Sequence, residues 1–223
     1  MKIIAHIQND FKEKFGIPRQ SGIADGTVSK IVFTKDYRNP EALRGIEGYS
    51  HLWLIWNFSK SARDTWSPTV RPPRLGGNKR MGVFATRSPF RPNPIGLSSV
   101  KLLGIEKSES DGTFLLVSGA DLLDGTPIYD IKPYLAFTDS HPDAICGFSD
   151  TVRDYSLPVE IPEQLISRIR QDKRDTLIRI LEGDPRPSYK DEGERVYSFL
   201  FADYEISFTV QDGILKVTEI KEI

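Results

Sequence analysis

Positively charged side chains gather in one part of this 223-residue chain, in a stretch that has no acidic side chains. No Asp or Glu occurs from Thr65 to Ile105, although the whole chain carries a net charge of −1. The basic residues in this window are Arg71, Arg74, Lys79, Arg80, Arg87, Arg91 and Lys101. Such a separation of charge predicts an anion site, which would bind a phosphate, a carboxylate or a nucleic-acid backbone.

The same window is rich in residues that shape loops, and its six prolines and five glycines exclude a long helix or a central strand. Its most distinctive run extends from Arg87 to Leu97 and includes Arg91, with Asn93 placed between two prolines. Prolines reduce the conformational freedom that a loop loses when it becomes ordered. The run therefore predicts a stiff loop that holds its polar side chains in place for a ligand.

A second polar cluster lies in an otherwise apolar run from Gly119 to Tyr134. Its members are Asp121, Asp124, Asp130 and Lys132. Carboxylates at the end of a strand could bind a ribose diol or an ammonium group. The alternative is an Asx-turn in which Asp130 pairs with Lys132.

Two further loops each present an arginine beside another side chain suited to recognition. Pro18-Arg19-Gln20 offers a guanidinium fork for a carboxylate and an amide for a base edge or a carboxylate, unless it is simply a solvated loop. In Asp184-Pro-Arg186-Pro-Ser-Tyr189 the arginine stands between prolines, near a tyrosine. An arginine with an aromatic side chain is typical of sites that stack and clamp an unpaired nucleotide.

The composition is that of an ordinary folded protein, with 39 % hydrophobic and 27 % charged residues. The single cysteine excludes an internal disulfide framework and a cysteine-rich metal site. The three histidines have no metal-ligand spacing, and neither GxGxxG nor a P-loop motif is present, so we expect no metal. No run approaches the roughly 20 apolar residues of a membrane span. The apolar N-terminal run is too short for a secretory signal, so we expect a cytoplasmic protein that does not contact a membrane.

The spacing of apolar residues predicts many short strands in the first part of the chain, a pattern that favours a barrel or a sandwich. The expected strands are 2–8, 26–34, 51–58, 97–107, 113–120 and 128–132. Asp111-Gly112 suits a tight turn between the fourth and the fifth of these strands. The strand 51–58 is apolar on both faces, and its end, from Asn57 to Lys60, is a place where a ligand could lie.

The second part of the chain combines helical and strand patterns. Apolar residues at helical spacing after Pro162 predict two short helices, or one helix with a break, that end at Gly183. Strands at 194–201, 204–210 and 214–220 then predict a three-stranded antiparallel sheet. We therefore expect a mainly β chain, α+β overall, with a small β-barrel domain at 1–150 and a smaller C-terminal α+β domain at 151–223.

Taken together, these motifs resemble the TrmO/TsaA-like family of tRNA methyltransferases. The resemblance rests chiefly on the run from Met81 to Gly96 and on Asp121-Leu-Leu-Asp-Gly-Thr-Pro127, and it covers both parts of the chain. It implies a homodimer whose β-barrel domain binds S-adenosylmethionine. The implied reaction is methylation of N6 of N6-threonylcarbamoyladenosine, next to the anticodon of tRNA.

The resemblance also implies roles for individual residues. The implied cofactor contacts are Pro18, Arg19, Gln20, Ser59, Lys60, Arg87, Leu97, Asp121, Leu122, Leu123 and Asp124. The implied substrate or tRNA contacts are Arg71, Arg74, Lys79, Arg80, Arg91, Asn93, Arg186 and Tyr189. No residue is assigned as the catalytic base. Two alternatives stay open, a non-catalytic RNA-binding module and a methyltransferase that acts on another small substrate.

Overall fold

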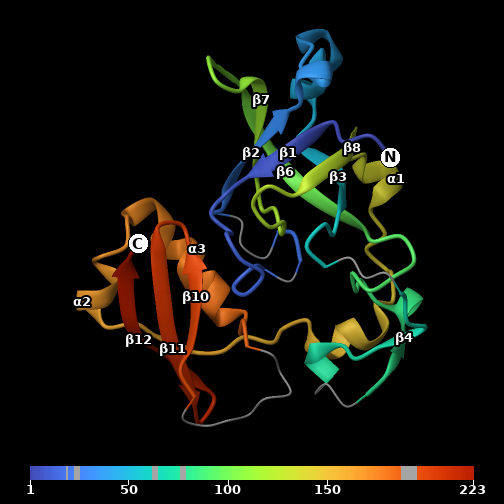
Figure 1. The fold of residues 1–223 in the computed structure, drawn as a ribbon. Helices are drawn as coiled ribbons and strands as arrows, with labels where there is room; N and C mark the ends of the chain where they lie inside the picture. Colours follow the sequence, from blue (N-terminus) through green and yellow to red (C-terminus); the bar gives the residue numbers. More distant parts are fainter. Residues whose placement is uncertain (19, 23–25, 62–64, 76–78, 187–194) are drawn as a thin grey trace.

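The structure is a computed structural model that describes residues 1–18, 20–22, 26–61, 65–75, 79–186 and 195–223. Figure 1 shows two groups of strands, with a short two-stranded hairpin to one side. Within the described ranges, no helix has the length and apolar character needed to cross a membrane.

Six antiparallel strands form the first group, and their pairing order closes on itself. They are β1 (Ala5–Gln8), β2 (Val28–Phe33), β3 (His51–Asn57), β6 (Ile95–Ser108), β7 (Gly112–Ser118) and β8 (Pro127–Pro133). They pair in the order β1-β2-β7-β6-β3-β8, and β8 pairs back to β1 through Ala5 and Ile128, which makes a closed barrel. Gly112, at a φ of 67°, begins β7 directly after the tight turn at 109–111, where the Asp-Gly sequence predicts a turn.

Strand alternation builds the core of this barrel. Leu52, Leu54 and Trp56 of β3 are buried, whereas the residues between them are partly exposed. Trp56 packs against Gly96 of the neighbouring strand so closely that a Cβ at Gly96 would lie 2.1 Å from the indole ring. A glycine is therefore required at that position.

Short elements connect the strands. The hairpin consists of β4 (Thr69–Val70) and β5 (Met81–Gly82). The 3-10 turns are η1 (Lys35–Tyr37), η2 (Pro40–Leu43), η3 (Ile46–Gly48), η4 (Pro73–Leu75), η5 (Val83–Ala85) and η6 (Gly147–Val152). The single-turn helix α1 (Ala136–Asp139) follows β8.

The second group of strands is a mixed sheet with two helices. Its strands are β9 (Val159–Glu160), β10 (Tyr197–Phe201), β11 (Tyr204–Gln211) and β12 (Ile214–Glu222), and its helices are α2 (Glu163–Ile166) and α3 (Gln171–Glu182). The expected three-stranded sheet is wrong by one strand, because β9 pairs in parallel with β12 at the edge. A two-residue strand has no periodicity that sequence analysis can detect.

A segment near the N-terminus belongs to the core of this second group. Phe11 is buried in the C-terminal hydrophobic cluster, and Phe15 packs against that cluster. The Phe15 ring meets that of Phe199 edge-to-face at 6.0 Å. Gly16, at a φ of 90°, also contacts Phe199, and a Cβ there would lie 2.3 Å from the ring.

Polar contacts strengthen the same attachment. The backbone N–H of Ala202 donates to the Asp10 carbonyl at 3.0 Å, and the backbone N–H of Leu200 donates to the Glu13 carboxylate at 2.7 Å. The ammonium of Lys173 on α3 pairs with the Asp10 carboxylate. The connection between β1 and β2 therefore joins the six-stranded group to the C-terminal sheet. The mainly β prediction is confirmed.

Candidate functional site

Two loops far apart in the sequence meet through Gln20 and Arg87. The Arg87 Nη1 donates to the Gln20 Oε1 at 2.6 Å, although 67 residues separate them. Pro18 is buried and Gln20 half-buried, whereas Arg87 is exposed. Arg19, between Pro18 and Gln20, lies outside the described residues. Two of the sequence-predicted cofactor segments therefore come together in the folded chain.

The Asp121 carboxylate lies within reach of the Arg87 charge. Its Oδ1 accepts a hydrogen bond from the Ser98 hydroxyl at 2.5 Å, and the backbone N–H of Ser21 donates to the same carboxylate. The buried indole N–H of Trp56 donates to the Ser98 Oγ at 2.9 Å, which holds the hydroxyl in place. Burial raises the pKa of Asp121 above its ordinary 3.8, and the hydrogen bond from Ser98 and the nearby Arg87 charge offset only part of this rise.

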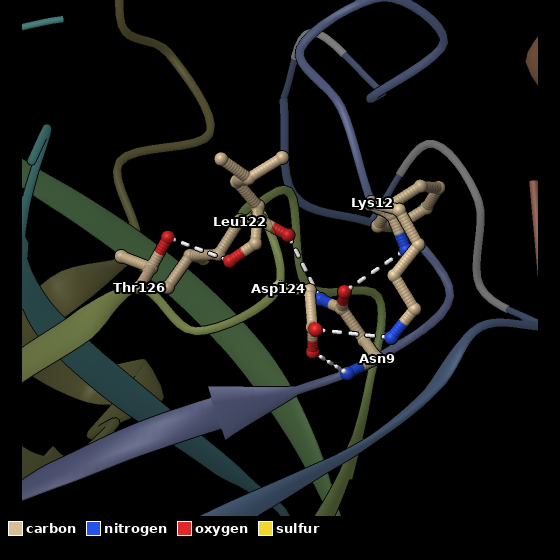
Figure 2. Close-up of polar contacts among 7 residues, drawn as sticks. Asn9, Lys12, Leu122, Asp124 and Thr126 are labelled. Carbon is tan, nitrogen blue, oxygen red and sulfur yellow. Dashed lines mark hydrogen bonds and ion pairs between the residues drawn. The ribbon is translucent and has the colours of Figure 1, made fainter. Parts of the chain in front are cut away.

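Asp124, the second acid of this run, has both carboxylate oxygens engaged (Figure 2). Its Oδ1 accepts from the backbone N–H of Asn9 at 2.8 Å, and its Oδ2 accepts from the Lys12 ammonium at 2.9 Å. Its own backbone N–H donates to the Phe11 carbonyl at 2.8 Å. In this arrangement Asp124 ties the loop to the segment that follows β1, whereas the Asp121 carboxylate contacts Ser98 and lies within reach of the Arg87 charge.

Asn9 is a residue that sequence analysis missed. Figure 2 shows its side chain directed at the loop, where Nδ2 donates to the Leu122 carbonyl at 2.8 Å. Its Oδ1 accepts from the backbone N–H of Phe11 at 3.0 Å, and the residue is only 9 % exposed. The one sequence signal was an Asn at the end of a predicted strand, a position that suits an Asx-type turn. Nothing in the sequence identified a partner 113 residues away.

The middle of the run is fixed by its own backbone. The Thr126 hydroxyl donates to the Leu123 carbonyl at 2.6 Å, which closes the turn before β8. Leu122 is fully buried and Leu123 half-buried. Within the described part of the chain, no hydrogen bond is made by the backbone N–H groups of Leu122 and Leu123. Leu123 is the less buried of the two, so its N–H is the donor more open to a ligand.

Three other predicted cofactor residues, Ser59, Lys60 and Leu97, lie at the surface of the six-stranded group. Ser59 and Lys60, after β3, are exposed, and the Lys60 carbonyl accepts from the Lys14 ammonium. Leu97 is 54 % exposed and points away from the side of β6 that carries Ser98 and contacts Asp121. One chain therefore presents Leu97 and Asp121 on opposite faces of β6.

Leu97 lines a hollow of about 360 Å³ on that outer face. The lining residues are Trp53, Ile55, Leu97, Lys132, Thr138, Asp139 and His141. The indole N–H of Trp53 donates to the Asp139 carboxylate at 2.8 Å, and this bond joins β3 to α1. Asp130 and Lys132 form an ion pair at 3.2 Å, as one interpretation of the sequence expected.

The predicted tRNA-contacting residues of the basic window are mostly exposed. Arg71, Lys79 and Arg80 are solvent-accessible, and the Arg80 Nη1 lies 3.5 Å from the Thr69 hydroxyl. Arg74 is on η4, but its side chain is outside the described part of the structure. Asn93 is exposed. Arg91 is half-buried and donates to the Thr86 carbonyl at 3.2 Å, so it braces its own loop.

Arg186, predicted to contact the substrate, is held by a buried carboxylate. Its Nε and Nη2 donate to the two oxygens of Asp184 at 2.9 and 3.0 Å, and the Tyr155 hydroxyl donates to the same carboxylate at 2.8 Å. Burial alone would raise the pKa of Asp184, but the Arg186 and Tyr155 bonds hold it below its ordinary value. Tyr189 lies outside the described residues.

Comparisons with known proteins agree with this two-part architecture. The family model for the tRNA-methyltransferase O N-terminal domain matches residues 6–140, and the model for the TrmO C-terminal domain matches residues 154–223. A tRNA (adenine(37)-N6)-methyltransferase from Escherichia coli (strain K12) is 40 % identical over 222 residues, which cover 96 % of this chain and 94 % of the relative.

A sequence relative and a solved structure, both from Pseudomonas aeruginosa, extend the comparison. A relative named as an S-adenosylmethionine-dependent methyltransferase is 40 % identical over 211 residues, covering 91 % of this chain and 89 % of its own. The crystal structure of TrmO from that organism superposes with a TM-score of 0.77 at 33 % identity, covering 98 % of this chain and 97 % of its own. The similarity is thus to a class of methyltransferases along almost the whole chain. The protein belongs to the TrmO family.

Proposed function

We propose that this chain is an S-adenosylmethionine-dependent methyltransferase that methylates N6 of N6-threonylcarbamoyladenosine at position 37 of tRNA. The observation that supports it most directly is the contact between Gln20 and Arg87, with the Asp121 carboxylate within reach of the Arg87 charge, although the three residues lie far apart in the sequence. The names of the relatives, tRNA (adenine(37)-N6)-methyltransferase and S-adenosylmethionine-dependent methyltransferase, supply the substrate and cofactor classes.

The polar groups at this place suit the cofactor. S-adenosylmethionine carries a carboxylate, an amino group, a sulfonium and a ribose diol. The Arg87 guanidinium suits the carboxylate, and the Asp121 carboxylate suits an ammonium or ribose hydroxyls. The N–H group of the half-buried Leu123 suits an acceptor on the adenine. When bound, the cofactor supplies an electrophilic methyl group.

The chain's own contribution to the reaction is placement of the substrate and loss of its proton. The substrate nitrogen belongs to a urea and is a poor nucleophile as a neutral N–H. Its proton must leave before or during methyl transfer, to a local base or to the substrate's own threonyl carboxylate. Most of the remaining acceleration comes from holding the two reactants in line.

The remaining features of the proposal concern organisation. The barrel domain, 1–150, carries the cofactor, and the C-terminal domain, 151–223, helps to recognise the tRNA in the cytoplasm. Leu97 and Asp121 lie on opposite sides of β6, so one cofactor molecule does not reach both within a single chain. A homodimer is the simplest arrangement in which both residues contact cofactor. In that arrangement Leu97 of one subunit approaches the cofactor held at Asp121 of the other.

The test is calorimetric titration with S-adenosylhomocysteine, the cofactor product. We expect wild-type binding and a large loss of affinity in Arg87→Ala, because the guanidinium contacts the amino-acid end. Arg44→Ala is the matched control, since Arg44 is an exposed arginine whose ion pair is with Glu41. Unchanged affinity in Arg87→Ala would contradict the assignment of Arg87. If the wild-type protein does not bind S-adenosylhomocysteine and is not stabilised by it, the result would favour the non-catalytic RNA-binding alternative.

A further inference from the structure

Two large aromatic side chains of the basic window lie exposed, one before and one after the hairpin of β4 and β5. Trp66 is 52 % exposed and Phe84 is 73 % exposed, and their ring centroids are 6.3 Å apart with an interplanar angle of 27°. Nearly parallel rings at this exposure keep ring surface open to solvent. Exposed apolar groups that gather in one place mark an interaction surface more often than singly scattered ones do.

The backbone beneath the two rings is well fixed. The strands β4 and β5 pair Thr69 with Gly82, and the backbone N–H of Val83 donates to the Pro68 carbonyl at 2.9 Å, which links the two arms next to the rings. Val83 is 1 % exposed and anchors η5, where Phe84 lies. The Thr86 hydroxyl donates to the Val83 carbonyl at 2.9 Å and closes this turn. The backbone next to the rings therefore needs little ordering when a ligand binds.

The charge around the rings selects the kind of ligand. Arg71, Lys79 and Arg80 are exposed close to the rings in the sequence, and the window contains no acidic residue. Exposed aromatic rings beside basic side chains are the combination with which proteins hold single-stranded nucleic acid, because bases stack on the rings and phosphates meet the cations. A paired duplex offers phosphates but keeps its bases stacked inside.

We infer that Trp66 and Phe84 form a stacking platform for an unpaired nucleotide of the tRNA anticodon loop, flanked by Arg71, Lys79 and Arg80 as phosphate contacts. The identity of the RNA rests on the proposed function, whereas the choice of unpaired over paired nucleotides rests on the rings themselves. Trp66 and Phe84 carry no charge, so the charge pattern of the sequence does not identify them. In this arrangement the rings stack a base and the neighbouring basic side chains bind phosphates.

The experiment compares the affinities of single variants for two labelled RNAs by fluorescence anisotropy. One RNA is a stem-loop with the sequence of a tRNA anticodon arm, and the other is a blunt duplex with the same number of phosphates. We expect Trp66→Ala and Phe84→Ala each to weaken stem-loop binding by roughly 5- to 150-fold and to leave duplex binding unchanged. Trp66→Phe keeps a ring and should restore most of the affinity.

Salt dependence and a matched control distinguish stacking from other causes. Because the rings carry no charge, the slope of log affinity against log salt should stay the same in Trp66→Ala, whereas Arg71→Ala should reduce it by about one unit. Phe137→Ala is the control, since Phe137 is an 89 % exposed ring on α1, outside the basic window. It should change neither RNA affinity.

Three results would overturn the platform. The first is equal loss of stem-loop and duplex binding in Trp66→Ala, and the second is wild-type stem-loop affinity in both alanine variants. The third is a changed oligomeric state of Trp66→Ala in sedimentation, which would make the rings a contact between copies of this chain. S-adenosylhomocysteine affinity is measured in the same variants. If it stays at the wild-type value while the platform fails, the proposed function still stands, and if wild type itself does not bind S-adenosylhomocysteine, it is the proposed function that fails.

Discussion

The side-chain amide of Asn9 donates to the Leu122 carbonyl at 2.8 Å, and the backbone N–H of the same residue donates to the Asp124 carboxylate at 2.8 Å. One residue at the end of β1 therefore fixes both ends of the Leu122–Asp124 run (Figure 2). The segment that follows Asn9 is packed into the C-terminal sheet through Phe11 and Phe15. The loop assigned to the cofactor is thus positioned by a segment that the C-terminal part of the chain also holds.

Replacing Asn9 by alanine should affect stability and cofactor binding together. The change leaves the Leu122 carbonyl and the Phe11 N–H without these partners in a buried place, which costs about 1–3 kcal/mol of unfolding free energy. It also frees the loop, so the Kd for S-adenosylhomocysteine should rise. Urea unfolding and calorimetry measure the two effects.

Asn39→Ala is the matched control for Asn9→Ala. Asn39 caps η2 by accepting from the Glu41 N–H at 3.0 Å, in an exposed place. Its loss should cost about 1 kcal/mol of stability and leave the Kd for S-adenosylhomocysteine unchanged. Equal cofactor affinity in the Asn9 and Asn39 variants would contradict a positioning role for Asn9.

The ion pair between Lys173 and Asp10 should contribute measurably to stability, because both side chains are mostly buried, with exposures of 15 and 23 %. We expect Lys173→Met to lower the free energy of unfolding by about 1–3 kcal/mol, since it leaves the Asp10 carboxylate without this partner. Lys216→Met removes an exposed pair with Glu160 and should cost less than about 1 kcal/mol. Similar losses in the two variants would show that the contact between Lys173 and Asp10 adds little.

Asp121 should make the stability of the protein depend on pH in an unusual direction. Its pKa in the folded chain is raised above 3.8, so folding favours its protonated form. The stability cost of the charged carboxylate is absent below pH 3.8 and grows as the pH rises through the folded pKa. Asp121→Asn should therefore gain thermal stability relative to wild type over that window and keep the gain at neutral pH.

The same variant should lose affinity for S-adenosylhomocysteine, because the amide cannot balance the positive amino end of the ligand. Thermal melting from pH 3 to pH 8 and calorimetry at neutral pH check the two halves of this prediction. A variant that is less stable than wild type at neutral pH would contradict the burial argument.

Arg186→Ala should act mainly on stability. The change leaves the Asp184 carboxylate, whose side chain is 7 % exposed, without its guanidinium partner. Removal of one partner from a buried pair costs about 3–5 kcal/mol, so a large drop in the urea midpoint is expected. Arg186→Lys keeps the charge but not the two parallel bonds and should recover only part of the loss. Wild-type stability together with a raised KM for tRNA would instead support direct contact with the substrate.

Sequence analysis predicted the strands well and the long-range contacts poorly. The alternation in β3 and the Asp111-Gly112 turn depend on neighbours in the chain, so their structure could be predicted from local pattern. The packing of Phe11 and Phe15 could not be predicted from local pattern, because the aromatic residues that cover them lie more than 180 residues further along. The short strand β9 forms only because β12 offers it a free edge.

The same division applies to the candidate site. Charge segregation and the family resemblance pointed to Arg87 and Asp121 as separate motifs. The structure bonds Arg87 to Gln20 and places Asp121 within reach of the Arg87 charge. The support from Ser98 and Trp56 could not be predicted, because it depends on which face of β6 and β3 each side chain occupies. Asp124 was expected to meet a ligand, and in the structure its carboxylate binds Asn9 and Lys12.

Mass spectrometry of tRNA nucleosides after reaction with S-adenosylmethionine tests the central claim most directly. Two matched tRNAs are compared, one carrying N6-threonylcarbamoyladenosine at position 37 and one carrying unmodified adenosine there. The account predicts that one methyl group appears on N6 of threonylcarbamoyladenosine and that the unmodified tRNA stays unchanged. Methylation of the bare adenosine, or no methylation of either tRNA, would contradict it.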